Sequence, residues 1–390
     1  MIDEAWMQEQ QVLSNWKWRV SYGETGNQGI GAYRTLTVLD AANYPYAGTL
    51  ESGVAMIDWR GPTNPNLRWE TTSQADAGLD IGFLNNRLNL TIDYYYKYTR
   101  DLLQNVTIPS SSGFSQMMVN SGNVTNQGLE VTLSYDVFAS GDWRWNIGAN
   151  VSLNRNKIGG LDGDQYATSL WSKADQVFLQ RNGCPIGTLY GYKEEGIDPA
   201  TGEIVYADLN GDGTITEADR TIIGNTNPKF TGALSTRLEW KGLSLSFMLY
   251  GSYGNDIFNY NLTDITMSNI GNITKAAYDG RWTADNPNGA TWPKATAGYT
   301  RTWLISDRYV EDGSFLKMKY LTLAYDWYNP AKWIQKINFN FTVSNLFTLT
   351  KYSWFEPDVN AGGTNAATPG VDSYSYPSAR TYALGINFTF

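Results

Sequence analysis

Large apolar side chains alternate with small or polar ones along residues 382–390 of this chain. The apolar positions are Tyr382, Leu384, Ile386, Phe388 and Phe390. Successive side chains of a β-strand point to opposite faces, so this pattern predicts a strand with one apolar and one polar face. Such a strand, with its apolar face toward lipid, is typical of the closing strand of a membrane barrel.

The same alternation recurs along the rest of the chain. It is clearest at 88–98, 129–137, 143–153, 243–249 and 339–343. A tilted membrane-spanning strand needs about 9–11 residues, whereas strands of soluble proteins usually have about 5–6. Several of these segments reach the membrane length. We therefore expect their apolar side chains to point outward, and Asn89, Asp93, Glu130 and Asn387 to point into the lumen.

The spacing of the strands predicts how they are connected. We expect strands near residues 16–22, 32–39, 69–84, 86–100, 127–138, 142–155, 186–195, 230–240, 243–259, 315–328, 335–346 and 379–390. Short connections at 84–87, 139–142 and 240–243 alternate with long ones at 40–66, 101–126, 156–185, 196–229, 260–314 and 347–378. Alternating short and long connections indicate an all-β, transmembrane antiparallel β-barrel, of which this chain supplies about a dozen strands.

Composition supports this interpretation and excludes several functions. Of the 390 residues, 14% are aromatic, including 26 Tyr and 15 Trp, which gather at membrane–water interfaces. The net charge of −9 argues against a nucleic-acid partner, which needs concentrated basic surface. The chain has no histidine and one cysteine, Cys184, so the usual catalytic base and a disulfide are both missing. We expect no catalytic residues and no enzymatic activity.

Five segments, in a fixed order, resemble one family. They are SYGETGN at 21–27, NPNLRWE at 64–70, NSGNVTNQGLE at 120–130, RWTADNP at 281–287 and GSFLKMK at 313–319. Together they resemble the SusC/RagA group of TonB-dependent outer-membrane transporters of the Bacteroidetes. The resemblance runs from about residue 12 to Phe390.

The resemblance implies a nutrient importer in the cell outer membrane. It implies a barrel of about 22 strands around a plug domain. Energy would come from TonB, and a SusD-like lipoprotein would cover the barrel and help capture glycans or peptides. Residues 1–390 would be the C-terminal half of this barrel, with the signal peptide and the plug domain lying outside them. Half a barrel leaves two unpaired edges in lipid, so we expect no transport by this chain alone.

A calcium-binding pattern stands out at residues 208–219. The expected oxygen ligands are Asp208, Asn210, Asp212, Thr214, Thr216 and Asp219, at positions 1, 3, 5, 7, 9 and 12 of the loop. Gly213 at position 6 permits the sharp turn that such a loop needs. Oxygen ligands without His or Cys favour Ca²⁺ over a transition metal. The ion would be structural and would hold a long external loop; the alternative is an Asx-rich turn without metal.

A second class of function also fits an aromatic, β-rich chain. It is a soluble or surface-anchored glycan-binding protein with a calcium-braced loop. The two classes differ in the position of the apolar side chains. A wide membrane barrel has them outside and polar side chains within, whereas a soluble protein buries them in its core.

Overall fold

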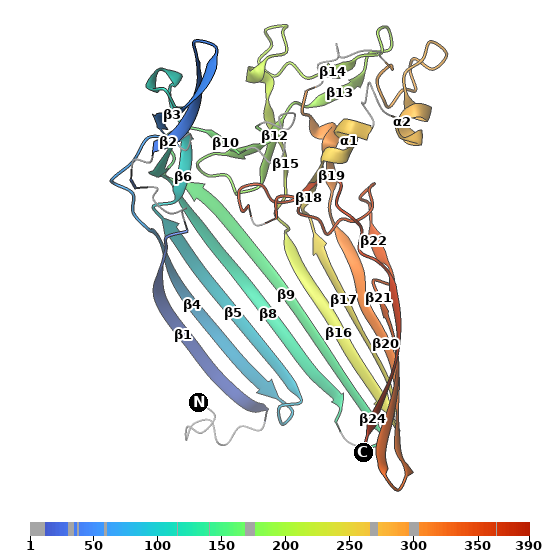
Figure 1. The fold of residues 1–390 in the computed structure, drawn as a ribbon. Coiled ribbons are helices and arrows are strands. Elements are labelled where there is room, and N and C mark those ends of the chain that lie inside the picture. Colours follow the sequence, from blue (N-terminus) through green and yellow to red (C-terminus); the bar gives the residue numbers. More distant parts are fainter. Residues whose placement is uncertain are drawn as a thin grey trace.

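The computed structural model describes residues 12–29, 35–36, 39–57, 61–114, 116–139, 141–167, 176–265, 272–295, 304–363 and 365–390. Within these ranges the chain has two layers. The first is one long, curved antiparallel sheet, and the second is a layer of short strands and helices at one end of it (Figure 1). No helix in the described ranges is long and apolar enough to cross a membrane.

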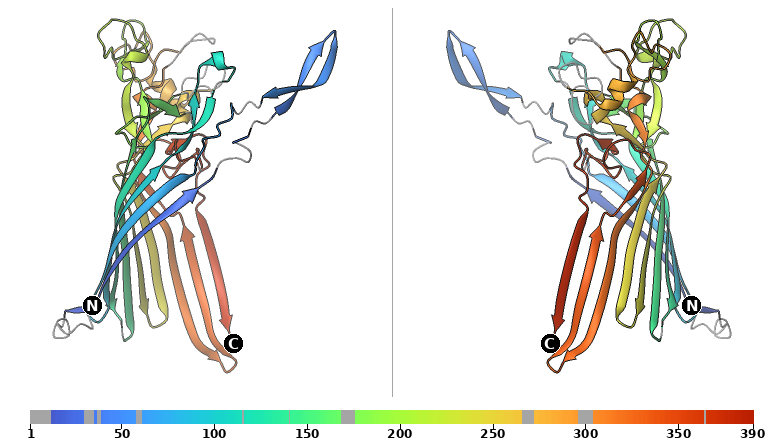
Figure 2. Two further views of the ribbon diagram at one scale, coloured as in Figure 1. Left: turned by 90° about the vertical axis from the view of Figure 1, so that its left-hand side faces the viewer. Right: turned by 90° about the vertical axis from the view of Figure 1, so that its right-hand side faces the viewer.

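The large sheet has 11 strands in the described part of the chain. Along the sheet they are β1 (Leu13–Asn27), β4 (Glu70–Phe83), β5 (Leu88–Arg100), β8 (Asn123–Phe138), β9 (Trp143–Gly159), β16 (Phe230–Trp240), β17 (Leu243–Tyr253), β20 (Phe315–Ala331), β21 (Ile334–Ser344) and β24 (Thr381–Thr389), with β22 (Thr348–Thr350) beside β20. Figure 2 shows that the sheet curves strongly and that β1 and β24 are its two separate edges.

The strand register confirms the predicted alternation. Leu90 lies opposite Leu133 of β8, and three positions further along β5 Asp93 lies opposite Glu130. Apolar residues therefore share one face of the sheet and charged residues share the other. The apolar face is not a closed core, because Leu90 and Leu133 are only partly buried and Ile386 is 57% exposed.

The connections confirm the predicted alternation of lengths. Tight turns join β4 to β5, β8 to β9, β16 to β17 and β20 to β21 at the lower end of the sheet in Figure 1. The turn after β4 has Leu84, Asn85 and Asn86 in the left-handed region, which a tight reversal of the chain requires. The long connections all emerge at the opposite end, where they build the second layer.

The second layer consists of short elements. Its strands are β2 (Leu39–Tyr46) with β3 (Thr49–Ile57), β6 (Leu103–Thr107) with β7 (Gln116–Asn120), β10 (Gln165–Ala167), β11 (Phe178–Gln180), β12 (Thr188–Gly191) and β15 (Thr221–Asn225) together, β13 (Glu194–Ile197) with β14 (Ile204–Tyr206), and β18 (Asp256–Asn259), β19 (Val310–Asp312) and β23 (Val371–Asp372) together. Its helices are α1 (Tyr260–Ile265), α2 (Lys275–Gly280), and the 3-10 turns η1 (Ser110–Ser112), η2 (Glu217–Asp219) and η3 (Asp307–Tyr309).

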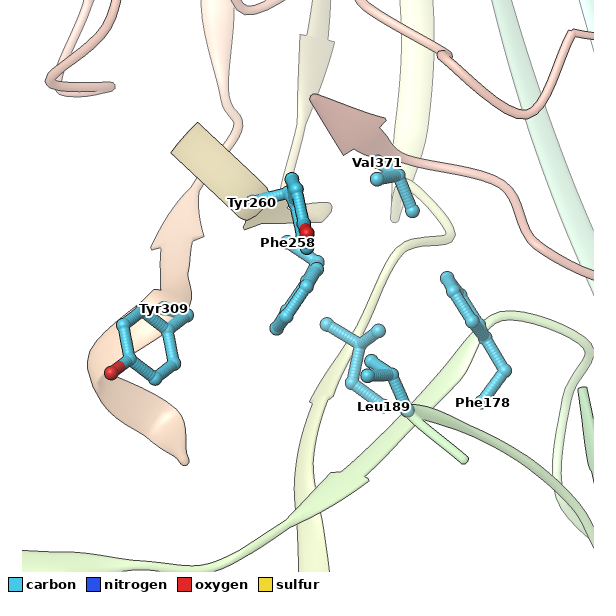
Figure 3. Packing of buried hydrophobic residues seen from close by; sticks show 7 residues of the cluster. Phe178, Leu189, Phe258, Tyr260, Tyr309 and Val371 are labelled. Atoms are coloured by element: carbon cyan, nitrogen blue, oxygen red, sulfur yellow. The ribbon is translucent and has the colours of Figure 1, made fainter. Parts of the chain in front are cut away.

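The main hydrophobic core lies in this second layer. It joins residues from segments that are far apart in the sequence (Figure 3). Its members are Val177, Phe178, Leu189, Phe258, Tyr260, Tyr309 and Val371, all at most 5% exposed. The external segments thus fold as a packed unit instead of extending separately into solvent.

Three predicted strands differ from the structure. The segment 186–195 forms parts of β12 and β13, which belong to small external sheets and not to the large one. The segment 243–259 is divided between β17 and β18 at Gly254, whose φ of +78° turns the chain out of the sheet. Of 32–39, residues 32–34 and 37–38 lie outside the described residues, 35–36 are a turn and bend, and Leu39 begins β2.

Candidate functional site

The polar face of the sheet carries a charged network near β1. The Arg19 guanidinium donates to both carboxylate oxygens of Asp80, from Nε at 3.0 Å and from Nη2 at 3.1 Å. Its Nη2 also lies 2.7 Å from Oδ1 of Asp93. Gly78 leaves the room for this contact, since a Cβ at its position would lie 2.4 Å from the Asp93 carboxylate. Arg19 therefore links three neighbouring strands on this face.

The network of polar side chains continues across the sheet. Tyr95 donates from its hydroxyl to Oδ1 of Asn154, 3.0 Å away, and so spans β8 between them. At the other side of the sheet, Asn338 donates to Asp326 at 2.8 Å and accepts from Asn387 at 3.2 Å. Charged and amide side chains therefore line this face at both sides of the sheet.

The apolar face carries aromatic side chains at both ends of its strands. Near the turns, the rings of Trp143 and Trp240 stack with centroids 5.5 Å apart. At the opposite ends of β16 and β17, the rings of Phe230 and Tyr253 lie 5.3 Å apart. Ten residues separate Phe230 from Trp240 along β16, which is about 33 Å of strand. At a tilt of about 35–45° this corresponds to about 25 Å, the height of the apolar band of membrane barrels.

A long segment between β22 and β24 covers the polar face at its upper end. Nζ of Lys317, on the polar face of β20, lies 2.9 Å from Oε2 of Glu356 and 3.1 Å from Oγ of Ser378. The two side chains of the ion pair are 2% and 8% exposed. The Tyr250 hydroxyl of β17 also donates to Asp358 of the same segment. Two strands of the large sheet therefore hold this segment in place.

The same segment is tied to the external core. The Tyr352 hydroxyl donates to Oδ2 of Asp372 at 2.7 Å, and both residues are buried. Burial and the neighbouring Asp372 carboxylate raise the pKa of the Tyr352 hydroxyl far above its usual value, so this hydroxyl stays protonated as a donor. Asn261 of α1 accepts from the backbone N–H of Tyr374 at 2.6 Å.

The predicted calcium loop closes on itself through backbone hydrogen bonds. Asp208 accepts from the N–H groups of Gly211 and Gly213, both at 2.7 Å. Asn210 accepts from Asp212 N–H at 2.9 Å, and Asp212 accepts from Thr214 N–H at 2.8 Å. Side-chain oxygens at the predicted positions 1, 3 and 5 therefore all turn into the loop.

Asp219, at the predicted position 12, accepts backbone N–H groups of the same loop. Its Oδ1 accepts from Leu209 N–H at 2.9 Å, and its Oδ2 accepts from Thr216 N–H at 2.8 Å. The Thr216 N–H and the other backbone donors hold the pKa of the Asp219 carboxyl below its usual value. Thr216 caps η2 and accepts from Ala218 N–H at 3.3 Å.

Three of the six predicted ligands are carboxylates, and the other three are Asn210, Thr214 and Thr216. In the described ranges no three Asp, Glu, His or Cys side chains come close enough together to hold a metal ion. The turns at Asp208, Asn210 and Asp212 are compatible with both alternatives, a calcium-binding loop and an Asx-rich turn without metal. Coordination by Asp219 would require its carboxylate to share oxygens that already accept backbone N–H groups. Calcium binding stays a prediction.

Sequence reasoning did not find the Lys317–Glu356 pair or the Arg19 network. Lys317 stands at a polar position between the apolar Leu316 and Met318, which is a signal for a charge on the inner face. Its partner Glu356 is 39 residues away, so nothing local indicates the pair. The inward position of Asp93 was predicted, but not its contact with Arg19.

Comparisons with known proteins agree with this geometry. Residues 11–268 match the family model described as TonB dependent receptor-like, beta-barrel. The chain is 32% identical to TonB-dependent receptor P3 of Formosa agariphila, over all of this chain and 41% of that protein. It is 30% identical to TonB-dependent receptor SusC of Bacteroides thetaiotaomicron, over all of this chain and 39% of that protein.

A solved structure shares the whole fold. The structure titled "Structure of the RagAB peptide transporter" superposes with a TM-score of 0.82 at 28% sequence identity. The match covers all of this chain and 42% of that chain. The chain thus spans about two fifths of the length of the relatives it matches.

Proposed function

Because the chain belongs to the TonB-dependent receptor β-barrel family, we propose that its protein imports nutrients across the outer membrane of a bacterium. This chain supplies part of the wall of the transport channel. The observation that carries the proposal is the division of the large sheet into an apolar face about 25 Å high between aromatic rows and a charged opposite face. The apolar face meets lipid and the charged face lines the lumen.

The soluble glycan-binding alternative is less consistent with the sheet. That alternative requires the apolar faces of the strands to be buried in a core. In the described residues the hydrophobic clusters lie in the external layer and at the upper ends of β8 and β9. Leu323 and Phe341, in the inner strands β20 and β21, are 47% and 39% exposed. Such a continuous exposed apolar surface is stable in a bilayer and not in water.

The energy source and the partners follow from the family. We propose that TonB drives import through a plug domain and that a SusD-like lipoprotein covers the external layer. Relatives with matching folds include a receptor named SusC and a structure titled as a peptide transporter. These names support glycans or peptides as the substrate class. The function is transport without catalysis.

Uptake by cells tests this proposal. Cells producing the whole protein should accumulate fluorescent oligosaccharides or oligopeptides, and cells lacking it should not. An uncoupler that collapses the proton gradient should abolish the difference, because TonB-dependent import draws its energy from the inner membrane. The two probes, supplied in parallel, identify the substrate class. Equal uptake of both probes in cells with and without the protein would contradict the proposal.

A further inference from the structure

The pairing between β9 and β16 ends below the upper end of β9. Ser152 and Thr231 form the last pair of this ladder, and in the described residues β9 continues to Gly159 with β8 as its only strand partner. A pocket of about 710 Å³ lies between this upper part of β9 and the chain that leads into β16. Its volume is within the range of about 300–1,000 Å³ that is usual for ligand pockets. The pocket is therefore at the junction of the large sheet and the external layer.

Side chains bridge the two walls of this pocket. Nη1 of Arg155 donates to the backbone oxygen of Lys229 at 3.2 Å. Nδ2 of Asn156 donates to Oδ1 of Asn227 at 2.8 Å, and Oδ1 of Asn156 accepts from Ile186 N–H at 2.7 Å. The Arg155 and Asn156 side chains therefore hold the walls of the pocket together.

Three donors in the lining have no acceptor among the described residues. Oδ1 of Asn154 accepts from the Tyr95 hydroxyl at 3.0 Å, and Oδ1 of Asn225 accepts at 3.0 Å from the backbone N–H two residues on, so the NH₂ group of each amide is open. Nζ of Lys229 lies 5.9 Å from the centre of the Tyr253 ring, and no described carboxylate lies within 4.0 Å of it. These N–H groups are suited to oxygen atoms of a ligand.

One carboxylate in the lining has an open acceptor. Oδ2 of Asp256 accepts from Asn225 N–H at 2.7 Å, and its Oδ1 has no partner in the described residues. Burial and the neighbouring Asp312 carboxylate raise the pKa of the Asp256 carboxyl, so the contacts around it compensate its charge only in part. The charges that line the pocket balance, because Arg155 and Lys229 equal Asp256 and Asp312 in number.

An uncharged ligand rich in hydroxyl groups matches this set of groups. Each hydroxyl of a sugar donates one hydrogen bond and accepts others, so one sugar ring can donate to Asp256 while it accepts from the three open donors. The Tyr253 ring in the lining offers apolar surface to the C–H groups of such a ring. A peptide fits less well, because in the described residues the lining offers only Pro185 and Tyr253 as apolar side chains.

We propose, on the basis of the import function proposed above, that this pocket binds one uncharged sugar residue of an incoming glycan. One sugar hydroxyl donates to Oδ1 of Asp256, and others accept from the three open donors. Asn154 shares the polar face of the sheet with Tyr95 and Glu130. A glycan held in the pocket is therefore at the upper end of the lumen face, and the pocket favours uncharged glycans among the imported substrates.

Arrays of immobilised oligosaccharides and oligopeptides test this site. The purified whole protein, fluorescently labelled and in detergent, is applied to hexasaccharides of glucose, mannose, xylose and galactose, to hexasaccharides of uronic acids, and to hexapeptides. We expect saturable binding to at least one uncharged hexasaccharide. Asp256→Asn keeps the acceptor for Asn225 N–H and turns the open acceptor into a donor, so it should weaken this binding about tenfold. Lys229→Met removes the ammonium group and should weaken it about fivefold.

Matched controls separate the pocket from general effects of the substitutions. Asp198→Asn alters a carboxylate that also accepts from a backbone N–H but lies in a turn outside the pocket. Lys319→Met removes an ammonium group that lies 5.3 Å from the centre of the Tyr250 ring, again outside the pocket. Both controls should leave binding unchanged, and all four variants should keep the heat-modifiable gel shift of the folded barrel.

Two results would overturn this site. The absence of binding to every uncharged hexasaccharide, including binding confined to hexapeptides or to uronic acids, would remove the assignment to an uncharged sugar. Equal sugar binding by Asp256→Asn, Lys229→Met and the unmodified protein would place the sugar outside the pocket. The import proposal fails separately, when cells with the whole protein take up neither oligosaccharides nor oligopeptides.

Discussion

At the scale of single residues, Lys317 and Glu356 form a buried ion pair between the large sheet and the covering segment. Nζ of Lys317 has two partners, Glu356 and Ser378, whereas Oε1 of Glu356 is buried without a hydrogen-bond partner in the described structure. Breaking a buried ion pair on one side leaves an uncompensated charge, which costs more than the pair contributes when intact. We therefore expect the pair to contribute to holding the covering segment on the polar face.

Replacement of Lys317 by Met should release this segment. We expect Lys317→Met to destabilise the packing of residues 351–378 by about 3–5 kcal/mol, measured as faster hydrogen exchange of that segment. The double variant Lys317→Met with Glu356→Met should recover most of the loss, because no charge remains buried. Lys275→Met is the control, since Lys275 pairs with Asp279 while 87% exposed and should change stability little. Unchanged exchange in Lys317→Met would show that other contacts hold the segment.

The calcium prediction also belongs to single residues. Asp212 accepts from Thr214 N–H and from the side chain of Asn210. If the loop binds Ca²⁺, Asp212→Ala should remove saturable binding in calorimetry on the whole protein, because a hard cation needs its carboxylate oxygen. Asp198→Ala is the control, because Asp198 forms an ordinary Asx turn with Ala200 N–H. Absence of saturable binding by the unmodified protein would leave only an Asx-rich turn.

The Asp219 carboxylate should make the same loop sensitive to acid. Its pKa is lowered by backbone donors, so its stabilisation is complete above the usual Asp pKa of about 3.9 and is lost as the pH falls through the lowered folded value. A spin label at Leu209→Cys, with Cys184→Ser, should become more mobile as the pH falls below about 4. With Asp219→Asn, mobility should be higher and independent of pH. A label whose mobility is constant from neutral to strongly acidic pH would refute this role.

At the scale of elements, each strand of the large sheet has a fixed lipid face and a fixed lumen face. Leu133 and Ser134 are neighbours in β8, but Leu133 lies opposite Leu90 and Ser134 lies opposite Asn89. A shift of register by one residue would turn every apolar side chain toward the lumen. The register is therefore set by the contrast between the two environments and by the tight turns that join the strands.

A lysine at these two neighbouring positions should have opposite effects. Leu133→Lys places a charge toward the middle of the bilayer and should lower the stability of the barrel by about 2–4 kcal/mol. Ser134→Lys faces the lumen and should cost little. Urea unfolding of the whole protein in lipid vesicles measures both changes. Similar losses for the two variants would mean that the faces are assigned incorrectly.

At the scale of the whole molecule, the large sheet does not close on itself. In the described residues β1 pairs only with β4, and β24 pairs only with β21. Each edge strand leaves a row of backbone N–H and C=O groups unpaired, and lipid cannot satisfy such groups. The external layer has its own core and its own ties to the sheet, so it can fold without closure of the barrel.

Production of residues 1–390 alone should therefore not yield an inserted barrel. We expect this chain to remain in the aggregated or peripheral fraction of membranes, because two open edges pair with other copies before they meet lipid. The whole protein should insert and show the heat-modifiable shift under the same conditions. Insertion of residues 1–390 as a monomer with ion conductance would contradict this expectation.

The amino-acid sequence by itself determined the strands of the large sheet, their two faces and their tight turns. The reason is that these features are local: a strand such as β8 shows its period of two in its own residues, and a turn needs only a few residues that tolerate positive φ. The loop at 208–219 was visible for the same reason, since its spacing of oxygen side chains is continuous in sequence.

Only the tertiary structure decided what the long connections do. The segment 186–195 alternates like a barrel strand, but Leu189 is buried against Phe178, Phe258 and Val371, which come from distant segments. The Lys317–Glu356 pair likewise depends on which segments are neighbours. Contacts of this kind have no local pattern, because their free energy arises only when separate segments meet.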